Sequence, residues 1–548
     1  MTVTRTLRLT AATLALAVGT SAFAADKHPV TGETLAEEQH FTYRLLDQFP
    51  TLDPQLNEET AGFHVIRDLF EGLMSQDADG NLIPGVATGF EASNENKTYT
   101  FTLRDTAKWS NGDPVTAHDF VYAWQRAVNP ETASPYGWYL ELTEMVNAKE
   151  ILAGEKDPSE LGVRAVDDLT LEVNLNIPLP YFPAMTTYAT LFPAHQATIE
   201  AHGADWTKPE NMVSNGAFVL TDLVLNEFHT REKNPMYWDA DNVIMEKVTG
   251  LVINDANQAL TRYKAGELDH LEPLPAGQFP ALQEELPAEA TSVPRLCSYY
   301  YAFNHRDDAE PWLSDVRVRT ALSYAIDRDV IVSQVLKGGQ WPAYNLAHLK
   351  TNGFAMPDIP YSTISQSERD AKAKELWDAA VADGVVPEEG LEIDLIYNTS
   401  ESHKAIATVI SQMWRQKLGV QTNLSNFEWK TYLEIRRDGQ FDVARSAWCA
   451  DYNEASSFLD LMTTPHGSND GKFSNETVDA LMRESKTSDD PNAQYTQVEK
   501  VLYEEMAVAP IYHYANTFLL NEEIKGWPYN NAENNWYSKN FYRVVLDD

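Results

Sequence analysis

The chain has 548 residues, of which 43% are hydrophobic and 22% charged, proportions typical of a globular protein with real cores. At about 100–200 residues per domain, this length indicates three or four domains. The formal charge is −39, from 42 basic and 81 acidic residues. Such an acidic surface repels polyanions, so nucleic acid and anionic lipid are poor partners.

The N-terminus has the pattern of a secretory signal peptide. Arg5 and Arg8 form a basic start, residues 9–18 are apolar, and Ala-Phe-Ala at 22–24 supplies the small residues of a cleavage site. The alternative is a short membrane anchor, but a bilayer span needs about 20 apolar residues and this stretch has about ten. We predict that residues 1–24 are a cleaved signal peptide and that the protein is exported to the periplasm.

The next elements alternate between strand and helix patterns. Residues 77–80 form a turn without the further oxygen ligands and closing Glu of a calcium loop. Residues 99–103 alternate in hydrophobicity as a half-buried strand does. Thr116 and Asp119 have the spacing of a capping box and open a helix with apolar residues at Phe120, Val121 and Trp124.

Helix and strand patterns also alternate in the second part of the chain. One helix is predicted to start at 314–315 and to end at the glycine pair 338–339. Residues 391–397 read as a strand, and a helix around 406–418 follows. No internal repeat interrupts this alternation, so the expected fold class is mixed α/β.

Cys297 and Cys449 are the two cysteines of the chain. In an exported protein, two cysteines are read more naturally as one disulfide than as two unpaired buried thiols, which is the alternative. A bridge requires Cα atoms within about 4.4–6.8 Å of each other. It closes a loop of about 150 residues, worth up to about 5 kcal/mol in the chain-entropy model.

Motifs of catalysis are absent from the sequence. We find no phosphate loop ending in Gly-Lys-Ser/Thr, no His-Glu-x-x-His and no Gly-x-Ser-x-Gly. The 13 histidines are scattered without metal-ligand spacing. A non-enzyme without metal or cofactor is therefore expected, although a pair of catalytic carboxylates leaves no regular sequence signature.

Several segments resemble the extracytoplasmic solute-binding proteins of family 5, which serve peptide and nickel importers. Within that family the resemblance is strongest to the Gram-negative periplasmic oligopeptide-binding proteins, and it covers essentially the whole mature chain. The segments that carry it are 107–122 (AKWSNGDPVTAHDFVY), 316–328 (VRVRTALSYAIDR), 441–454 (FDVARSAWCADYNE), 296–301 (LCSYYY), 133–136 (ASPY) and 397–400 (YNTS) with His403.

The resemblance implies a periplasmic binding protein fold with two lobes, a hinge and an extra domain beside the first lobe. The first lobe would comprise residues 27–70, 195–296 and 516–548. The extra domain would comprise 71–194 and the second lobe 297–515. The implied partners are short peptides and the permease subunits of an inner-membrane ABC importer, and the protein itself is expected to be a monomer.

The resemblance also assigns the two ends of a bound peptide to charged residues. Asp451 is implied to bind the N-terminal ammonium, because a buried charge must be paired. Arg445, His403 and Arg436 are implied to bind the C-terminal carboxylate at positions that depend on peptide length. Two structural interpretations stay open: Asp451 caps a turn before Asn453, and Arg445 is an ion-pair partner within the protein.

The cleft of such a protein ignores ligand side chains by pairing with the peptide backbone and leaving roomy, water-filled pockets. Taken singly, the aromatic residues would be assigned to the core and Glu58 to the surface. The positions that match family cleft walls and pockets are Glu58, Tyr136, Tyr300, Trp429, Trp448 and Cys449.

Two positions depart from the family pattern. Ala302 follows the tyrosine triplet where close family members carry a glutamate, and Leu336 stands where they carry a lysine, with Lys337 beside it. A preference for basic side chains or for long peptides is therefore in doubt.

Other functions remain open from the sequence. A murein tripeptide receptor of the same family would use Arg436 for the extra carboxylate of its ligand. Nickel or haem binding fits poorly, because the residues for peptide ends are present. A periplasmic peptidase would need a nucleophile, metal or carboxylate dyad, and a holdase would need exposed apolar surface.

Overall fold

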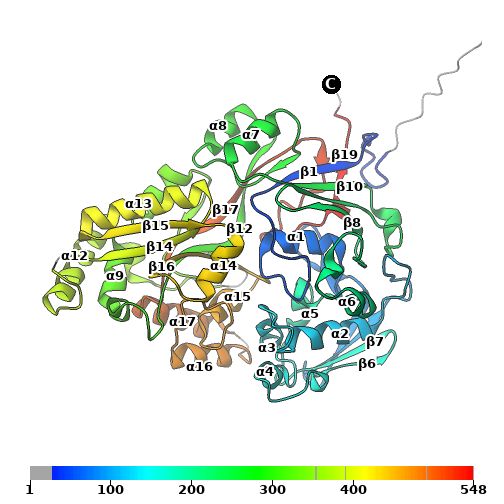
Figure 1. The fold of residues 1–548 in the computed structure, drawn as a ribbon, viewed down its shortest axis with the longest axis horizontal. Helices are drawn as coiled ribbons and strands as arrows, with labels where there is room; N and C mark the ends of the chain where they lie inside the picture. The colour runs from blue at the N-terminus through cyan, green and yellow to red at the C-terminus, as the bar shows by residue number, and fades with distance from the viewer. Residues whose placement is uncertain (1–26, 352–353, 389, 489, 547–548) are drawn as a thin grey trace, which may run out of the picture.

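The computed structural model describes residues 27–351, 354–388, 390–488 and 490–546. The predicted signal peptide, residues 1–24, lies outside the described residues. Figure 1 shows two halves side by side, joined by long strands between them. We call residues 27–296 with 516–546 the first half and residues 297–515 the second half. In the described residues no helix is long and apolar enough to cross a membrane.

An 11-stranded mixed sheet runs through both halves. Its order is β15 (Gln421–Phe427), β14 (Glu392–Asn398), β16 (Val443–Cys449), β12 (Ala290–Phe303), β17 (Val508–Leu520), β11 (His270–Leu271), β1 (His40–Leu45), β10 (Lys247–Val252), β9 (Phe228–Lys233) and β8 (Phe218–Val224), and β13 (Trp341–Pro342) pairs with β17.

Strands β12 and β17 pass from one half into the other. Their antiparallel pairing runs from Ala290 to Pro294, stops, and resumes at Ser298 in a shifted register. In the gap, the Leu296 N–H donates to the Ala532 carbonyl, and the Leu296 carbonyl accepts from the Ala450 N–H. The sheet therefore loses its regular ladder at the junction between the halves.

Smaller sheets belong to the first half. A four-stranded antiparallel sheet has the order β4 (Ala87–Ser93), β5 (Thr98–Leu103), β7 (Thr170–Asn174) and β6 (Val163–Asp167). Two hairpin-like pairs are β2 (Met74–Gln76) with β3 (Leu82–Pro84) and β18 (Ile524–Lys525) with β19 (Tyr542–Arg543).

The helices cover the sheets on both sides (Figure 1). Those of the first half are α1 (Thr60–Leu69), α2 (Ala117–Val128), α3 (Trp138–Leu142), α4 (Ala148–Leu152), α5 (Phe182–Met185), α6 (Gln196–His202), α7 (Ala256–Lys264) and α8 (Phe279–Glu285). Those of the second half are α9 (Val316–Tyr324), α10 (Arg328–Val330), α11 (Pro360–Thr363), α12 (Gln366–Ala382), α13 (Glu401–Leu418), α14 (Trp429–Arg437), α15 (Ser456–Leu459), α16 (Glu476–Ser485) and α17 (Asn492–Glu504).

Short 3-10 turns and one π-helical segment complete the secondary structure. They are η1 (Pro158–Glu160), η2 (Ala189–Leu191), η3 (Gly203–Thr207), η4 (Ala240–Asn242), η5 (Pro311–Ser314), the π-helical η6 (Ile331–Leu336), η7 (Asp460–Met462) and η8 (Ser538–Asn540).

Several local predictions are confirmed. The predicted strands are β5 and β14, and α2 starts with the predicted capping box, in which Asp119 Oδ2 accepts from the Thr116 N–H at 2.7 Å. The helix predicted at 406–418 is the C-terminal part of α13, which starts five residues earlier, at Glu401.

The single helix predicted between 314 and 339 is wrong. Helix α9 ends at Tyr324, and a separate short helix, α10, starts after Asp327, whose carboxylate accepts from the Val330 N–H. The chain then continues as the π-helical segment η6, which ends at Lys337 in a left-handed conformation. Asp327 acts as an N-cap, because its carboxylate accepts from an N–H group that has no partner within the new helix. Between its two ends, the prediction used only the spacing of apolar residues, which continues across this interruption.

Each half has hydrophobic cores of its own, and Tyr452 of the second half also packs into the core of the first half. One core joins the main sheet of the first half to residues 71–194, for example through Phe41, Phe70, Phe101 and Trp124. The second half has its own cores around Tyr301 and Phe458. Residues 71–194 therefore share a core with the rest of the first half rather than folding around a separate one.

Candidate functional site

A cavity of about 350 Å³ lies between the two halves. Both halves supply polar and aromatic side chains to its wall. Of the residues predicted from the sequence, the wall includes Glu58, Tyr136, His403, Trp429, Arg436, Arg445, Trp448, Cys449 and Asp451.

Strand β16 and its extension form one side of the cavity. Side chains alternate between the two faces of a strand, so Arg445, Ala447 and Cys449 share a face, and all three line the cavity. Asp451 lies two residues beyond the end of the strand and lines the same cavity. The strand thereby presents a cation and a carboxylate to one space.

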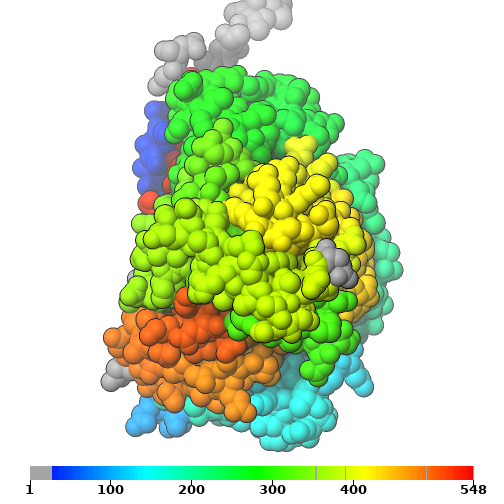
Figure 2. Space-filling view, turned by 90° about the vertical axis from the view of Figure 1, so that its left-hand side faces the viewer, coloured from blue at the N-terminus to red at the C-terminus, as the bar shows by residue number. Residues whose placement is uncertain are grey.

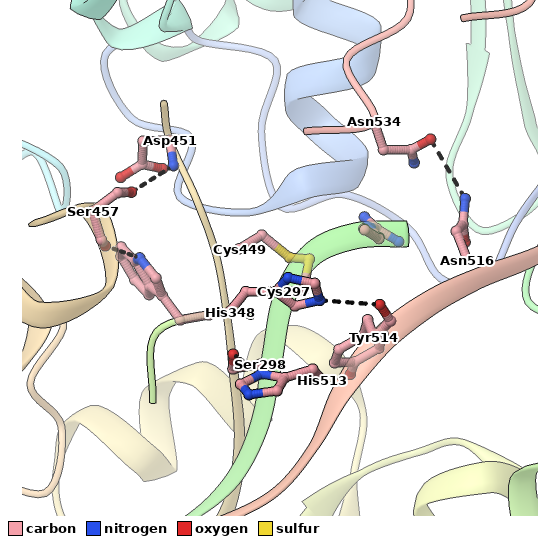
Figure 3. The surroundings of a disulfide bond; sticks show 12 residues. Cys297, Ser298, His348, Cys449, Asp451, Ser457, His513, Tyr514, Asn516 and Asn534 are labelled. Carbon is pink, nitrogen blue, oxygen red and sulfur yellow. Dashed lines mark hydrogen bonds between the residues drawn. A yellow bond between two sulfur atoms is a disulfide. The ribbon is translucent and has the colours of Figure 1, made fainter. Parts of the chain in front are cut away.

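Asp451 is 7% exposed and has no cationic partner at ion-pair distance within the described residues. Its Oδ1 accepts a hydrogen bond of 3.1 Å from the Tyr136 hydroxyl. Its backbone N–H donates to Ser457 Oγ at 2.7 Å, as Figure 3 shows. Burial raises the pKa of Asp451 to about 7, although hydrogen bonds from Tyr188 and Tyr136 oppose this rise. A cation in the cavity would remove the cause of the shift.

Arg445 is also 7% exposed and has no carboxylate partner in the part of the chain that is described. It donates to the Tyr514 hydroxyl at 2.9 Å and to Asn398 Oδ1 at 3.3 Å, and its guanidinium lies over the Tyr299 ring. Its Nε has no hydrogen-bond partner. A buried guanidinium held only by neutral groups is suited to an anionic ligand.

His403 lies in the first turn of α13, although the helix predicted around 406–418 would have left it before the helix start. Its Nδ1 is buried without a partner, and its ring centroid is 5.6 Å from that of Tyr299. Burial and the neighbouring Arg445 hold the pKa of His403 well below its usual value. The imidazole is therefore neutral near pH 7 and offers a hydrogen bond rather than a charge.

Arg436 differs from Arg445 because its charge is already balanced. It forms a buried ion pair with Asp470 and donates to Ser446 Oγ at 3.2 Å. Asp470 lines the same cavity and was not predicted from the sequence. A carboxylate that replaced Asp470 as the partner of Arg436 would leave the Asp470 charge buried and unpaired.

Tyr300 does not line the main cavity. It is 3% exposed and belongs to the wall of a separate small cavity behind β12, together with Ala302 and Ser446. The tyrosine of this strand that supports the charged cluster is Tyr299, under Arg445. Tyr299 does not line the main cavity itself and contributes to it through Arg445.

The predicted disulfide between Cys297 and Cys449 is present, and Figure 3 shows it between two strands. The two cysteines are directly opposed in the β12–β16 ladder. Their Cα atoms are 4.0 Å apart, closer than the predicted range, because opposed residues without ladder hydrogen bonds lie closest in an antiparallel pair. Both line the cavity, so the bridge is part of its wall.

The two halves touch each other around the cavity. Glu58 forms an ion pair with Arg437, and Lys486 forms one of 2.6 Å with Glu144. The Trp138 and His466 rings are 3.8 Å apart between centroids. Figure 2, viewed from the side of the second half, shows α16 and α17 in orange close to cyan residues of the first half. The structure is therefore closed over its cavity.

Sequence reasoning missed Arg67 and Glu533, which enter the cavity from the first half. It also missed Tyr514 and Asn398 as the partners of Arg445. No spacing rule links these residues, since they come from separate segments. In the described residues there is no group of three or more His, Cys, Asp or Glu side chains that could hold a metal ion.

Comparison with known proteins places this geometry in a family. The model of bacterial extracellular solute-binding proteins, family 5, matches residues 81–470. The chain belongs to this family. Curated relatives include the periplasmic murein peptide-binding protein MppA of Escherichia coli, 42% identical over 94% of this chain and 95% of the relative. The periplasmic oligopeptide-binding protein OppA of Escherichia coli is 40% identical over 97% of each chain.

Solved structures of the family share the two-lobe α/β fold. The Escherichia coli MppA structure has a TM-score of 0.90, covering 93% of this chain and 100% of its own. Haemophilus influenzae OppA in complex with RPPGFSPFR, 36% identical, has 0.88 with the same coverage.

The unliganded open form of MppA is much less similar. Its TM-score is 0.67 at 42% identity, although the match covers 94% of this chain and 99% of that one. The lobes of the present structure are therefore arranged as in the complex with a peptide rather than as in the open form.

Proposed function

We propose that the protein is the periplasmic substrate-binding component of a peptide ABC importer, which captures short peptides and delivers them to the permease without chemistry of its own. The observation that carries this proposal is the pair Asp451 and Arg445. They are two buried, opposite charges without ionic partners, facing one closed cavity. A peptide carries the matching ammonium and carboxylate at its two ends.

The spacing of these two residues limits the length of a peptide held at both ends. Asp451 and Arg445 are six residues apart in the chain, so their Cα atoms are separated by at most about 20 Å at about 3.3 Å per residue. An extended peptide spans at most about 3.3–3.6 Å per residue. A ligand clamped by both side chains therefore has at most about six residues, and fewer when the side chains reach toward each other.

We also propose two lobes joined by a hinge, with the ranges that the family resemblance implies. Residues 27–70, 195–296 and 516–548 would form the first lobe, 71–194 the extra domain and 297–515 the second lobe. The chain crosses between the lobes in β12 and β17, where the ladder is interrupted after Pro294. Opening at this interruption would admit the ligand, and closure would bury both of its ends.

A murein tripeptide receptor is the second candidate, because MppA is among the relatives. The Arg436–Asp470 ion pair speaks against it for this chain. An additional ligand carboxylate at Arg436 would have to displace Asp470 from a buried pair. We therefore favour peptides with ordinary α-linkages and a single terminal carboxylate.

The proposal also covers compartment and partners. The signal-peptide pattern at 1–24 supports export to the periplasm. We propose that the protein is a monomer whose partners are peptides and permease subunits. The acidic net charge argues against nucleic acid as a partner. A peptidase would return cleaved products, and a holdase would accept ligands with blocked N-termini.

Calorimetric titration tests the function directly. We expect tri-alanine to bind and to be recovered uncleaved, and its N-acetyl and C-amide forms and the murein tripeptide to bind more weakly. Mass spectrometry of ligands released from protein purified from its own periplasm should find short, α-linked peptides. Cleavage of tri-alanine, or tighter binding of the murein tripeptide than of any α-linked peptide, would contradict the proposal.

A further inference from the structure

Two charged residues of the first half lie near Asp451 and have no role in the function proposed above. Arg67 is on α1, and Glu533 lies in the segment between β18 and η8. Both line the cavity, and both interact electrostatically with the Asp451 carboxylate. They belong to the end of the cavity where the ligand ammonium would bind.

Arg67 is a buried cation without a direct partner. It is 7% exposed, and its guanidinium makes no hydrogen bond or ion pair with any described residue. Its Nε is fully buried, and its guanidinium carbon lies 5.8 Å from the centroid of the Phe63 ring. A buried guanidinium with unpaired N–H groups is stabilised by a ligand that offers a hydrogen-bond acceptor.

Glu533 is held only by neutral donors. Its Oε2 accepts from Gln76 Nε2 at 2.7 Å and from Asn535 Nδ2 at 2.9 Å, and the Asn453 backbone N–H also donates to the carboxylate. No cation lies at ion-pair distance from it in the described residues. Arg67 acts on it only electrostatically, so the two charges are close but not joined.

The charges at this end determine which ligand is balanced. Asp451 and Glu533 with Arg67 give a net charge of −1, which one ligand ammonium brings to zero. A second charge of either sign on the ligand would leave a net charge in a space of low dielectric, which is costly. An apolar group would exclude water and leave the Arg67 guanidinium without a hydrogen-bond acceptor. A neutral group that both donates and accepts avoids both penalties.

The ligand group nearest to the ammonium is the side chain of the first residue. We propose that Arg67 and Glu533 together select peptides whose first side chain is neutral and hydrogen-bonding, such as Gln, Asn or Ser. An amide side chain would donate to the Glu533 carboxylate and accept from the Arg67 guanidinium. This inference rests on the proposed peptide-binding function and names the ligand class that the site prefers.

Four tripeptides that differ only in their first residue test the selection. We expect Gln-Ala-Ala to bind the native protein about tenfold more tightly than Lys-Ala-Ala or Glu-Ala-Ala, and several-fold more tightly than Leu-Ala-Ala. Competition calorimetry at pH 7.5 and constant ionic strength gives the four affinities. Affinities within twofold of each other would overturn the proposal.

Variants that remove one charge should change the relative affinities of the acidic and basic peptides in opposite directions. Glu533→Gln leaves an excess positive charge once the ammonium is bound, so Glu-Ala-Ala should gain about tenfold relative to Gln-Ala-Ala, and Lys-Ala-Ala should lose as much. Arg67→Gln should shift both ratios in the opposite direction, if this buried position accepts glutamine. Glu284→Gln, an exposed residue outside the cavity, is the control and should leave both ratios unchanged.

The outcomes separate this inference from the function beneath it. If the Lys and Glu peptides shift in the same direction in Glu533→Gln, the charge-balance argument fails while peptide binding stands. If neither tri-alanine nor any of the four peptides binds the native protein, the peptide-binding function fails. Glu533→Gln alone suffices for the decision should Arg67→Gln not fold.

Discussion

The Tyr136 hydroxyl, carried by the first half, donates a hydrogen bond to the Asp451 carboxylate, carried by the second half. Both groups are almost completely buried, so this bond exists only when the halves are closed. A ligand ammonium at Asp451 would therefore bind to a carboxylate that the opposite half helps to orient. Ligand capture and closure are thereby linked at one residue.

Asp451→Asn should weaken a free tripeptide strongly while barely changing the weak binding of its N-acetyl form. Breaking a buried charge pair costs about 3–5 kcal/mol, or about 100- to 1000-fold in affinity. Calorimetry on the four combinations gives the coupling energy between the carboxylate and the amine. Asp105→Asn, an exposed residue, is the control. A coupling near zero would mean that Asp451 is a structural cap.

Arg445→Gln and Arg436→Gln should have different consequences although both arginines line the cavity. Arg445 has no anionic partner to strand, so its loss should weaken peptides with a free carboxylate, spare C-terminal amides and leave the melting temperature nearly unchanged. Arg436→Gln leaves Asp470 buried and unpaired and should destabilise the fold by about 3–5 kcal/mol. Thermal denaturation and calorimetry of both variants check this. Equal stability losses would contradict the assignment.

The two ion pairs between the halves should contribute unequally to closure. Lys486 and Glu144 are 11% and 21% exposed, whereas Arg437 is 48% exposed. Lys486→Gln should therefore lower peptide affinity about tenfold, or about 1.4 kcal/mol, and Arg437→Gln by less than about 1 kcal/mol. Small-angle scattering should show a smaller radius of gyration with saturating tri-alanine. An unchanged profile, or equal effects of the two variants, would count against closure by these contacts.

Peptide affinity should fall as the pH decreases below 7. Burial raises the pKa of Asp451 to about 7 in the closed protein without ligand, and a bound ammonium lowers it again, so binding that starts from this closed form releases a proton. Affinity therefore rises with pH up to about 7, and it falls again above about 8, where the peptide amine loses its proton. Titrations in buffers of different ionisation enthalpy measure the released protons.

Two variants separate the groups that share this pH range. Glu533 also has a pKa raised by burial to about 7, and it and Arg67 both act electrostatically on Asp451. Asp451→Asn should abolish most of the proton release, and Glu533→Gln should reduce it less. Affinity that is flat between pH 5 and 7 in the native protein would show that Asp451 does not exchange a proton on binding.

The sequence was informative where one continuous segment builds the site. Residues 441–454 form β16 and its extension, and the resemblance of this one segment to the family located Arg445, Cys449 and Asp451, all of which line the cavity. The disulfide was predictable for another reason: the chain has two cysteines, and an exported chain with two cysteines tends to pair them. Apolar spacing did not locate the start of α13, which begins at Glu401 and includes His403, five residues before the predicted start at 406.

The remaining features depend on contacts between distant segments. Nothing near Glu58 in the sequence indicates that Arg437, 379 residues away, neutralises it. Arg436 and Asp470 are 34 residues apart within the second half, and Arg67 and Glu533 come from opposite ends of the chain within the first half, so each pair is brought together by the fold of its own half. Sequence periodicity predicts which face of a helix or strand is buried, but it does not predict which buried charged residues form pairs.

The crossing of β12 and β17 between the halves restricts how the molecule can move. Two hydrogen-bonded antiparallel strands form a ribbon that twists and bends at its weakest rungs but resists sliding of one strand along the other. We therefore expect the halves to open by bending and twisting of this ribbon, without sliding along each other. The same surfaces of the two halves would then meet at each closure, so a ligand would always encounter one closed geometry.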